Sequence, residues 1–137
     1  MKRAYFDASA IAKLIREERE SLALVDFLDD PMEAVTSAIS EIEVPRALRR
    51  HGVTAGEVAE ALKGFIVVSV DAGIRARASA LEPATLRSLD ALHLATALAI
   101  GTDGLHVVTY DDRLAQAARE QGLTVVQPGR TSAGASA

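Results

Sequence analysis

Four acidic residues hold positions at which a carboxylate could do chemistry: Asp7, Glu43, Asp90 and Asp111. Asp7 and Asp111 each follow a short apolar run and precede a helical pattern, so either can be a helix N-cap. Asp90 falls in the first turn of an expected helix, where the helix dipole favours a negative charge. Taken singly, each of these three acids has a structural explanation.

Glu43 is harder to explain as a surface residue. On a helix, Ile39 and Ala47 lie four residues before and after it, which places the carboxylate in an apolar row. An ionised carboxylate that faces a protein core is costly unless a cation or hydrogen-bond donors meet it. The structural alternative is an ion pair with Arg46 or Arg50 at the rim of the helix.

Taken together, the four acids predict a metal site. Open parallel sheets place ligands at the carboxyl ends of their strands, where Asp7 and Asp111 fall. Clustered carboxylates raise one another's pKa values, and a divalent cation removes that penalty. Oxygen ligands select magnesium or manganese, and such ions commonly serve phosphoryl chemistry. His93, one turn after Asp90, has no histidine partner at i+4 and is interpreted as structural.

The elements that must position these acids alternate between strand and helix. Near-continuous apolar strands of this kind are typical of a mostly parallel sheet covered on both faces. We expect Thr36-Ser37 and Thr54 to cap helices. The expected strands are 4–6, 65–70, 105–110 and 123–127. The expected helices are 8–15, 17–28, 38–50, 55–62, 72–81, 88–100 and 112–120.

The composition is that of one ordinary globular α/β domain. The 137 residues are 49% hydrophobic and 25% charged, which argues against disorder and fibrous structure. There is no cysteine, no apolar run of membrane-spanning length and no secretory pattern, so we expect a cytoplasmic protein. The net charge of −4 indicates that any nucleic acid is bound at a local site. The small polar residues 129–137 are expected to form a flexible C-terminal tail.

Four blocks in this order resemble the PIN-domain nucleases, and within them the VapC-type toxins of bacterial and archaeal toxin–antitoxin pairs. The resemblance covers the chain to about residue 127, and the block around Asp90 is its most specific part. The blocks are Asp7-Ala8-Ser9-Ala10, the segment from Thr36-Ser37 through Glu43 to Arg49, Leu86 to Ala95, and Val108 to Leu114.

The resemblance implies a PIN domain over 1–128, a three-layer α/β/α fold with a mostly parallel sheet of four or five strands. It also implies that Asp7, Glu43, Asp90 and Asp111 bind Mg²⁺, or Mn²⁺ in its place, and hydrolyse RNA phosphodiesters. Glu43 would act through a water, and Asp112 could replace Asp111 as the fourth acid. The hydroxyls of Ser9 and Thr109 would hold carboxylates or metal waters in place.

The same resemblance implies partners. It predicts a homodimer and a VapB-type antitoxin whose C-terminal segment presents an arginine to the acids. Bases at Lys13, Arg16, Arg46, Arg49, Arg50 and Arg87 could contact RNA phosphates.

Other function classes fit less well. Haloacid-dehalogenase-type phosphotransferases carry an acid where this chain has Ser9, the order of acids does not suit a receiver domain, and Asp7 to Ala10 lacks the glycines of a dinucleotide-binding turn. The remaining alternative is a catalytically inactive PIN-like module that binds RNA or protein. Because all four acids are present, we favour the metal-dependent endoribonuclease toxin.

Overall fold

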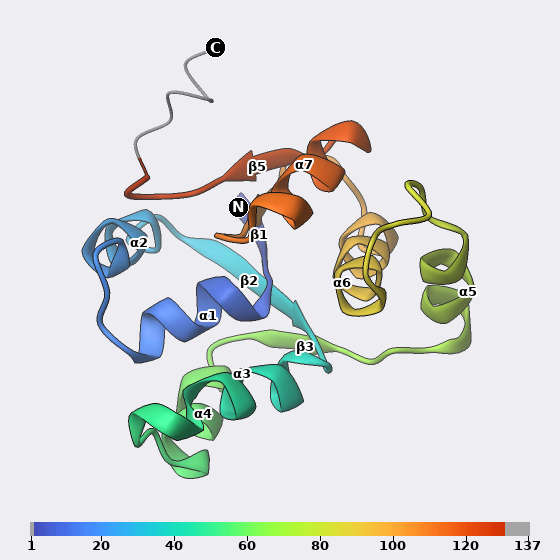
Figure 1. The fold of residues 1–137 in the computed structure, drawn as a ribbon. Helices are drawn as coiled ribbons and strands as arrows, with labels where there is room; N and C mark the ends of the chain where they lie inside the picture. Colours follow the sequence, from blue (N-terminus) through green and yellow to red (C-terminus); the bar gives the residue numbers. More distant parts are fainter. Residues whose placement is uncertain (1, 131–137) are drawn as a thin grey trace.

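The computed structural model describes residues 2–130, and these form a five-stranded parallel sheet between two layers of helices (Figure 1). The strands are β1 (Lys2–Phe6), β2 (Met32–Ser37), β3 (Ile66–Val68), β4 (Leu105–Val108) and β5 (Thr124–Val126). The helices are α1 (Ala8–Ile15), α2 (Ser21–Phe27), α3 (Ser40–Leu48), α4 (Ala55–Leu62), α5 (Ala72–Ala80), α6 (Ser88–Ala99) and α7 (Asp112–Glu120), with a 3₁₀ turn at Arg49–His51.

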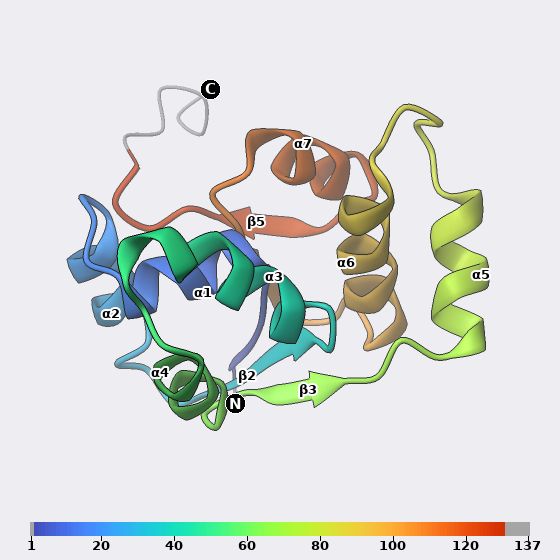
Figure 2. The ribbon, with the colours of Figure 1, turned by 60° about the horizontal axis from the view of Figure 1, so that its bottom comes forward.

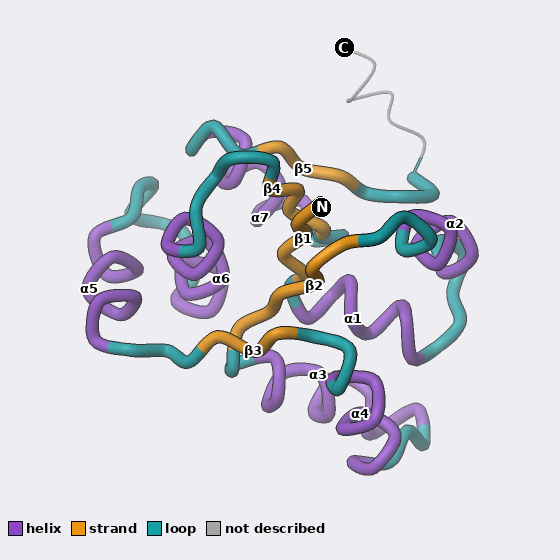
Figure 3. The backbone as a smooth tube through the Cα atoms, turned by 180° about the vertical axis from the view of Figure 1, so that it is seen from behind, coloured by secondary structure: helices purple, strands orange, loops and turns teal. Residues whose placement is uncertain are grey.

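The sheet order is β3-β2-β1-β4-β5, so β1 is the central strand and pairs in parallel with β2 and β4 (Figure 3). The chain builds outward from β1 through β2 to β3, and then returns to the other side of β1 to form β4 and β5. The strand order therefore reverses between β1 and β4, and ligand crevices of open α/β sheets lie at this point of reversal. The predicted α/β/α fold is confirmed.

Successive side chains of β1 pack into opposite halves of the core. Ala4 and Phe6 pack with Ile11, Val44 and other side chains of α1 to α4. Tyr5 faces the opposite way. It joins the cluster that α6 and α7 bury, whose large members include Leu94, Leu105 and Leu114. Helix α5 packs on the outer side of α6 and away from the sheet (Figure 2).

Three predicted helices, those over 8–15, 55–62 and 112–120, have the observed bounds. Asp7, Thr54 and Asp111 each accept a hydrogen bond from a backbone N–H of the helix that follows, and at Thr54 the side chain of Glu57 completes a capping box. Helices over 72–81 and 88–100 are each one residue shorter than predicted, and the outer ends of the predicted strands 65–70, 105–110 and 123–127 belong to loops.

The prediction for 17–50 is wrong in three places. Strand β2 was not predicted, and Thr36-Ser37 ends this strand instead of capping a helix. The Thr36 hydroxyl is fully buried and donates to the Phe6 carbonyl at 2.7 Å, which ties β2 to β1. Helix α2 starts only at Ser21, whose hydroxyl bridges the backbone of Glu18 and Lys13. The third helix ends at Leu48 and continues as a 3₁₀ turn.

The packed chain extends slightly past the expected boundary at 128. Arg130 lies in the predicted tail, yet its Nη1 donates to the Asp112 carboxylate at 2.8 Å, and the Tyr110 hydroxyl donates to the Pro128 carbonyl. The rest of that tail, 131–137, lies outside the described residues. None of the described helices is both long and apolar enough to cross a membrane.

Candidate active site

An acidic cavity of about 260 Å³ lies at the carboxyl ends of β1 and β4. All four acids predicted from the sequence line it, each from a different segment. Asp7 follows β1, Glu43 lies in α3, Asp90 lies in the first turn of α6, and Asp111 comes just before α7. The fold thus brings together carboxylates that are up to 104 positions apart.

Asp7 is the most deeply placed of these acids, with only 4% of its surface exposed. Its Oδ1 accepts hydrogen bonds from the Ser9 hydroxyl at 2.7 Å and from the Ala10 N–H at 3.1 Å, and its Oδ2 accepts one from the Thr109 hydroxyl at 2.7 Å. Burial raises the pKa of Asp7 above its usual range, although His93 and these hydrogen bonds oppose the shift. The side chain is fixed in direction while its charge is only partly compensated.

The two hydroxyls also join the ends of β1 and β4. Ser9 Oγ accepts a hydrogen bond from the Tyr110 N–H at 2.9 Å, and Thr109 Oγ1 accepts one from the Asp111 N–H at 3.0 Å. Each hydroxyl therefore donates to the Asp7 carboxylate and accepts from the loop that carries Asp111. The expectation that Ser9 and Thr109 hold a carboxylate in place is confirmed.

Glu43 is held by His93 and makes no ion pair with Arg46 or Arg50. Glu43 Oε1 lies 2.7 Å from His93 Nε2, and His93 Nδ1 lies 2.6 Å from the Tyr5 hydroxyl. Burial raises the pKa of Tyr5 well above its usual range, so its hydroxyl keeps its proton. Both hydrogen bonds of His93 form when the Tyr5 hydroxyl donates to Nδ1 and the Nε2–H donates to the Glu43 carboxylate.

His93 was interpreted from the sequence as a partly buried structural residue. It is almost fully buried, at 2% exposure, yet it also lines the acidic cavity and fixes the Glu43 carboxylate. Its position three residues after Asp90 was the available signal, because residues three apart share a helix face. Its partners Tyr5 and Glu43 come from β1 and α3, and neither is near it in sequence.

Asp90 has a buried oxygen that makes no hydrogen bond among the described residues. This Oδ2 forms only an ion pair with Arg87 Nε, at 3.6 Å. Burial, followed by the charge of Asp111, raises the pKa of Asp90. Buried polar atoms are nearly always partnered in folded proteins. A carboxylate oxygen that lacks a hydrogen bond, in a residue that lines an acidic cavity, is therefore a fitting ligand for a cation.

The fourth acid on the cavity is Asp111, and Asp112 lies elsewhere. Asp111 Oδ1 caps α7 by accepting from the N–H groups of Arg113 at 2.9 Å and Leu114 at 3.2 Å. The Asp112 side chain is 84% exposed and pairs with Arg130 at 2.8 Å. Asp111 therefore both caps α7 and lines the acidic cavity.

The bases proposed to contact RNA have different surroundings. Lys13 is only 11% exposed, pairs with Glu20 at 2.9 Å and Glu18 at 3.3 Å, and lies over the Tyr110 ring. These contacts make Lys13 a structural residue and leave it little surface to offer a phosphate. Arg46, Arg49 and Arg50, on α3 and the 3₁₀ turn, are exposed.

The acidic cavity offers the carboxylate oxygens that a hard cation prefers, but these oxygens are not gathered around one point. Within residues 2–130, no three acidic or histidine side chains come close enough together to hold one ion as they stand. Magnesium commonly takes only one or two carboxylates directly and keeps several waters. The arrangement fits that mode, with the remaining acids reaching the ion through water.

Comparisons with known proteins place the chain among PIN domains. The family model described as PIN domain matches residues 4–120. Ribonuclease VapC35 of Mycobacterium tuberculosis is 45% identical over 133 residues, which cover 92% of this chain and 97% of that relative. Ribonuclease VapC46 of the same organism is 41% identical over 129 residues, covering 93% and 99%. A solved toxin–antitoxin complex from Klebsiella pneumoniae superimposes with a TM-score of 0.70 at 24% identity, covering 91% of this chain and 97% of that one, which supports the fold alone.

Proposed function

We infer that this chain, which belongs to the PIN-domain family and within it to the VapC ribonucleases, is an endoribonuclease toxin. We propose that it hydrolyses RNA phosphodiester bonds at the acidic cavity, with Mg²⁺ or Mn²⁺ bound by Asp7, Asp90 and Asp111 and with Glu43 assisting. The observation that carries this proposal is the convergence of four carboxylates on a single cavity at the point where the strand order reverses; one of the four has a buried oxygen that makes no hydrogen bond.

The residues present suit such an ion. Asp90 Oδ2 has no competing hydrogen bond, and Asp7 Oδ2 accepts only one, so both retain lone pairs for a cation or its waters. Burial raises the pKa values of both Asp7 and Asp90, and the charge of Asp111 adds to the shift at Asp90. A bound divalent cation would offset the cost of these buried charges, polarise the phosphate and lower the pKa of a coordinated water.

The protein's own groups then have separate tasks. Asp7 is held by two hydroxyls and a backbone N–H, so it presents its free lone pairs in a fixed direction. Glu43 is oriented by the His93 Nε2–H and is placed to orient the attacking water and accept its proton. Preorganised groups of this kind accelerate a reaction because they need no rearrangement in the transition state.

The test is cleavage of total cellular RNA by the purified chain, with Mg²⁺, with Mn²⁺ and with EDTA, next to Asp90→Asn. We expect discrete metal-dependent fragments that Asp90→Asn reduces at least a hundredfold, together with weaker Mg²⁺ binding by calorimetry. The matched pair Asp111→Asn and Asp112→Asn separates the two neighbouring acids, since asparagine also caps helices well. Cleavage should fall in the first and persist in the second. Near-normal Mg²⁺-dependent cleavage by Asp90→Asn would refute the assignment.

We also propose a cytoplasmic homodimer and a VapB-type antitoxin as partners. The chain shares its fold with a chain of a solved toxin–antitoxin complex, and such a partner is consistent with that fold. An arginine from the antitoxin would suit the acidic cavity, because a guanidinium competes well for carboxylates that otherwise bind a cation. Leu22 and Val25 on α2 are 74% and 48% exposed and supply apolar surface for an interface. Mass measurement of the chain alone and with its antitoxin would test both assemblies.

A further inference from the structure

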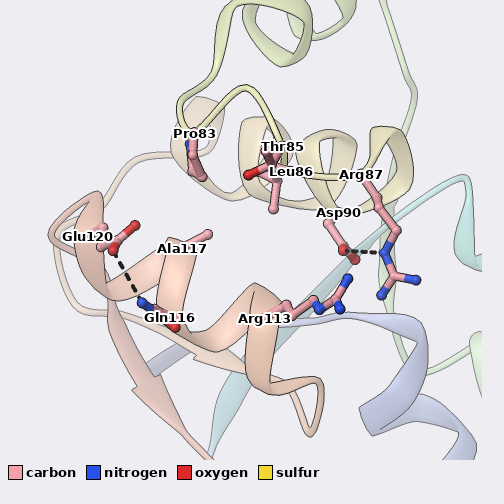
Figure 4. A pocket seen from close by; sticks show the side chains of 9 residues that line it. All are labelled: Pro83, Thr85, Leu86, Arg87, Asp90, Arg113, Gln116, Ala117 and Glu120. Carbon is pink, nitrogen blue, oxygen red and sulfur yellow. Dashed lines mark hydrogen bonds and ion pairs between the residues drawn. The ribbon is translucent and has the colours of Figure 1, made fainter.

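A second cavity of about 470 Å³ lies beside the acidic one, between the segment 83–87, the start of α6 and helix α7 (Figure 4). The two cavities share Asp90, which lines both. Its volume is within the range of pockets that enclose small organic ligands. A strand with one phosphate at the acidic cavity therefore has a hollow of nucleotide size next to that phosphate.

The end of this second cavity nearest Asp90 carries two guanidinium groups. Figure 4 shows that Arg87, the residue before α6, and Arg113, in the first turn of α7, are both directed toward the Asp90 side of the second cavity. Arg113 is exposed and pairs with no carboxylate in the described part of the chain. Arg87 is 64% exposed and forms an ion pair with Asp90 through its Nε at 3.6 Å, too long for a hydrogen bond. Guanidinium groups with free N–H donors bind phosphate oxygens in a bidentate manner.

The far end of the second cavity offers different chemistry. Leu86 and Ala117 form an apolar wall, while Gln116 and Glu120 present an amide and a carboxylate joined only by a long contact of 3.5 Å. Amide and carboxylate groups recognise the edges of unstacked bases and the ribose 2′-hydroxyl of single-stranded RNA. Cations at one end and hydrogen-bonding groups along an apolar wall at the other match the phosphate and base of a nucleotide.

We propose that this second cavity binds the RNA nucleotide next to the cleaved bond, with Arg113 and Arg87 holding its phosphate and with Gln116 and Glu120 contacting its base or ribose. The inference rests on the proposed function, because it takes the cleaved phosphate to lie at the acidic cavity. It makes Arg113 a substrate-binding residue and the α7 surface a determinant of which RNA sequence is cut.

The first test measures RNA binding without cleavage. The probe is a fluorescently labelled single-stranded RNA of mixed sequence in EDTA, titrated with wild type, Arg113→Gln and Arg119→Gln over a range of salt. Arg119 is the matched control, since it is an exposed arginine of the same helix that does not line the second cavity. We expect Arg113→Gln to bind about tenfold more weakly and its salt slope to fall by about 0.7, the value of one phosphate contact on a single strand. Arg119→Gln should stay within about twofold of wild type.

The second test uses cleavage with Mg²⁺ and sequencing of the cut ends. Gln116→Ala, an exposed position that should fold normally, is expected to change the base preference at one position beside the cut. If wild type cleaves, Asp90→Asn does not, and Arg113→Gln binds RNA like Arg119→Gln, the second cavity is not a subsite and the nuclease assignment stands. If wild type fails to cleave but Arg113→Gln still weakens RNA binding selectively, the nuclease assignment fails and the RNA site stands. Wild type that binds no RNA would overturn the subsite.

Discussion

Replacing Asp7 by asparagine is expected to stabilise the protein while it removes cleavage. The Asp7 side chain is buried, and that burial raises its pKa, so its ionised form costs folding free energy at neutral pH. Asparagine has nearly the same shape. Its Oδ1 can accept from the Ser9 hydroxyl and the Ala10 N–H, and its amide can donate to Thr109 Oγ1. The three contacts persist and the buried charge is gone.

The expected change in the free energy of unfolding depends on the buried charge and on those three contacts. Without a divalent cation, we expect Asp7→Asn to raise the free energy of unfolding by about 1 kcal/mol at pH 7, or roughly 3 °C in Tm for a chain of this length. Asp7→Ala is the contrasting variant. It removes the cap of α1, worth about 1 kcal/mol, and leaves buried donors unsatisfied at about 1–3 kcal/mol. It should therefore unfold some 2–4 kcal/mol more easily than Asp7→Asn.

The pH dependence has a definite sign. A carboxyl whose folded-state pKa is raised favours the protonated fold, so the wild type is relatively most stable below the ordinary value of 3.8. It loses that stability as pH rises through the raised folded pKa. The advantage of Asp7→Asn should thus be absent near pH 3, grow as pH rises above 3.8, and level off beyond the raised pKa.

The assay is thermal unfolding by circular dichroism in EDTA between pH 3 and 8. Addition of Mg²⁺ should then stabilise wild type and leave Asp7→Asn unchanged, because a ligand stabilises only the state that binds it. The reasoning is refuted if Asp7→Asn is less stable than wild type at pH 7 in EDTA, or if the difference between them does not shrink toward pH 3.

Two further predictions concern the residues behind the site and a helix outside it. Tyr5→Phe removes the hydroxyl that hydrogen-bonds to His93 Nδ1. We expect a tenfold lower kcat with KM within twofold, and a loss of about 1 kcal/mol in stability. An unchanged kcat in steady-state cleavage would show that Glu43 does not need the Tyr5–His93 hydrogen bond to hold it in place. Thr54→Ala breaks the capping box of α4 and should cost about 1 kcal/mol in urea unfolding, with cleavage unaffected because α4 does not line the acidic cavity. An unaltered urea midpoint would contradict the second prediction.

The helices predicted most accurately are those with local boundary signals. Asp7 and Thr54 each place a side-chain acceptor where a helix begins, and that interaction involves residues only three positions apart. Such contacts are encoded within one turn of chain. Propensity and spacing were therefore sufficient for α1, α4 and α7.

Strand β2 was missed because its partners are distant in sequence. Only Val35 in its first four residues is β-branched, and the Thr36-Ser37 pair that follows is equally typical of a helix cap. Its strand conformation depends on pairing with β1 on one side and β3 on the other, with Val35 opposite both Tyr5 and Ile66. A window of six residues does not contain that information.

The acidic cavity also has features that short segments of sequence indicate and features that depend on contacts between distant residues. The acids could be found from the sequence because Glu43 falls on an apolar helix row, where a carboxylate is costly, and because Asp7 and Asp111 follow strands, where open parallel sheets bind their ligands. The support for Glu43 could not, because it depends on Tyr5 and His93, which are 88 positions apart. The choice between Asp111 and Asp112 required the structure as well, since adjacent residues carry the same charge and either can cap a helix.

The location of charge explains how an acidic chain can act on a polyanion. The net charge is −4, and without the four acids of the cavity the 19 acidic residues would equal the 15 lysines and arginines in number. The excess negative charge can thus be assigned to one site, where Asp7 and Asp90 already resist ionisation. A divalent cation there would cancel half of it, and Arg87 and Arg113 lie beside Asp90 to meet the next phosphate. Repulsion of RNA is therefore a local property of the metal-free site. We expect Mg²⁺ to strengthen RNA binding by an inactive Glu43→Gln variant, which keeps the three acids proposed to bind the ion.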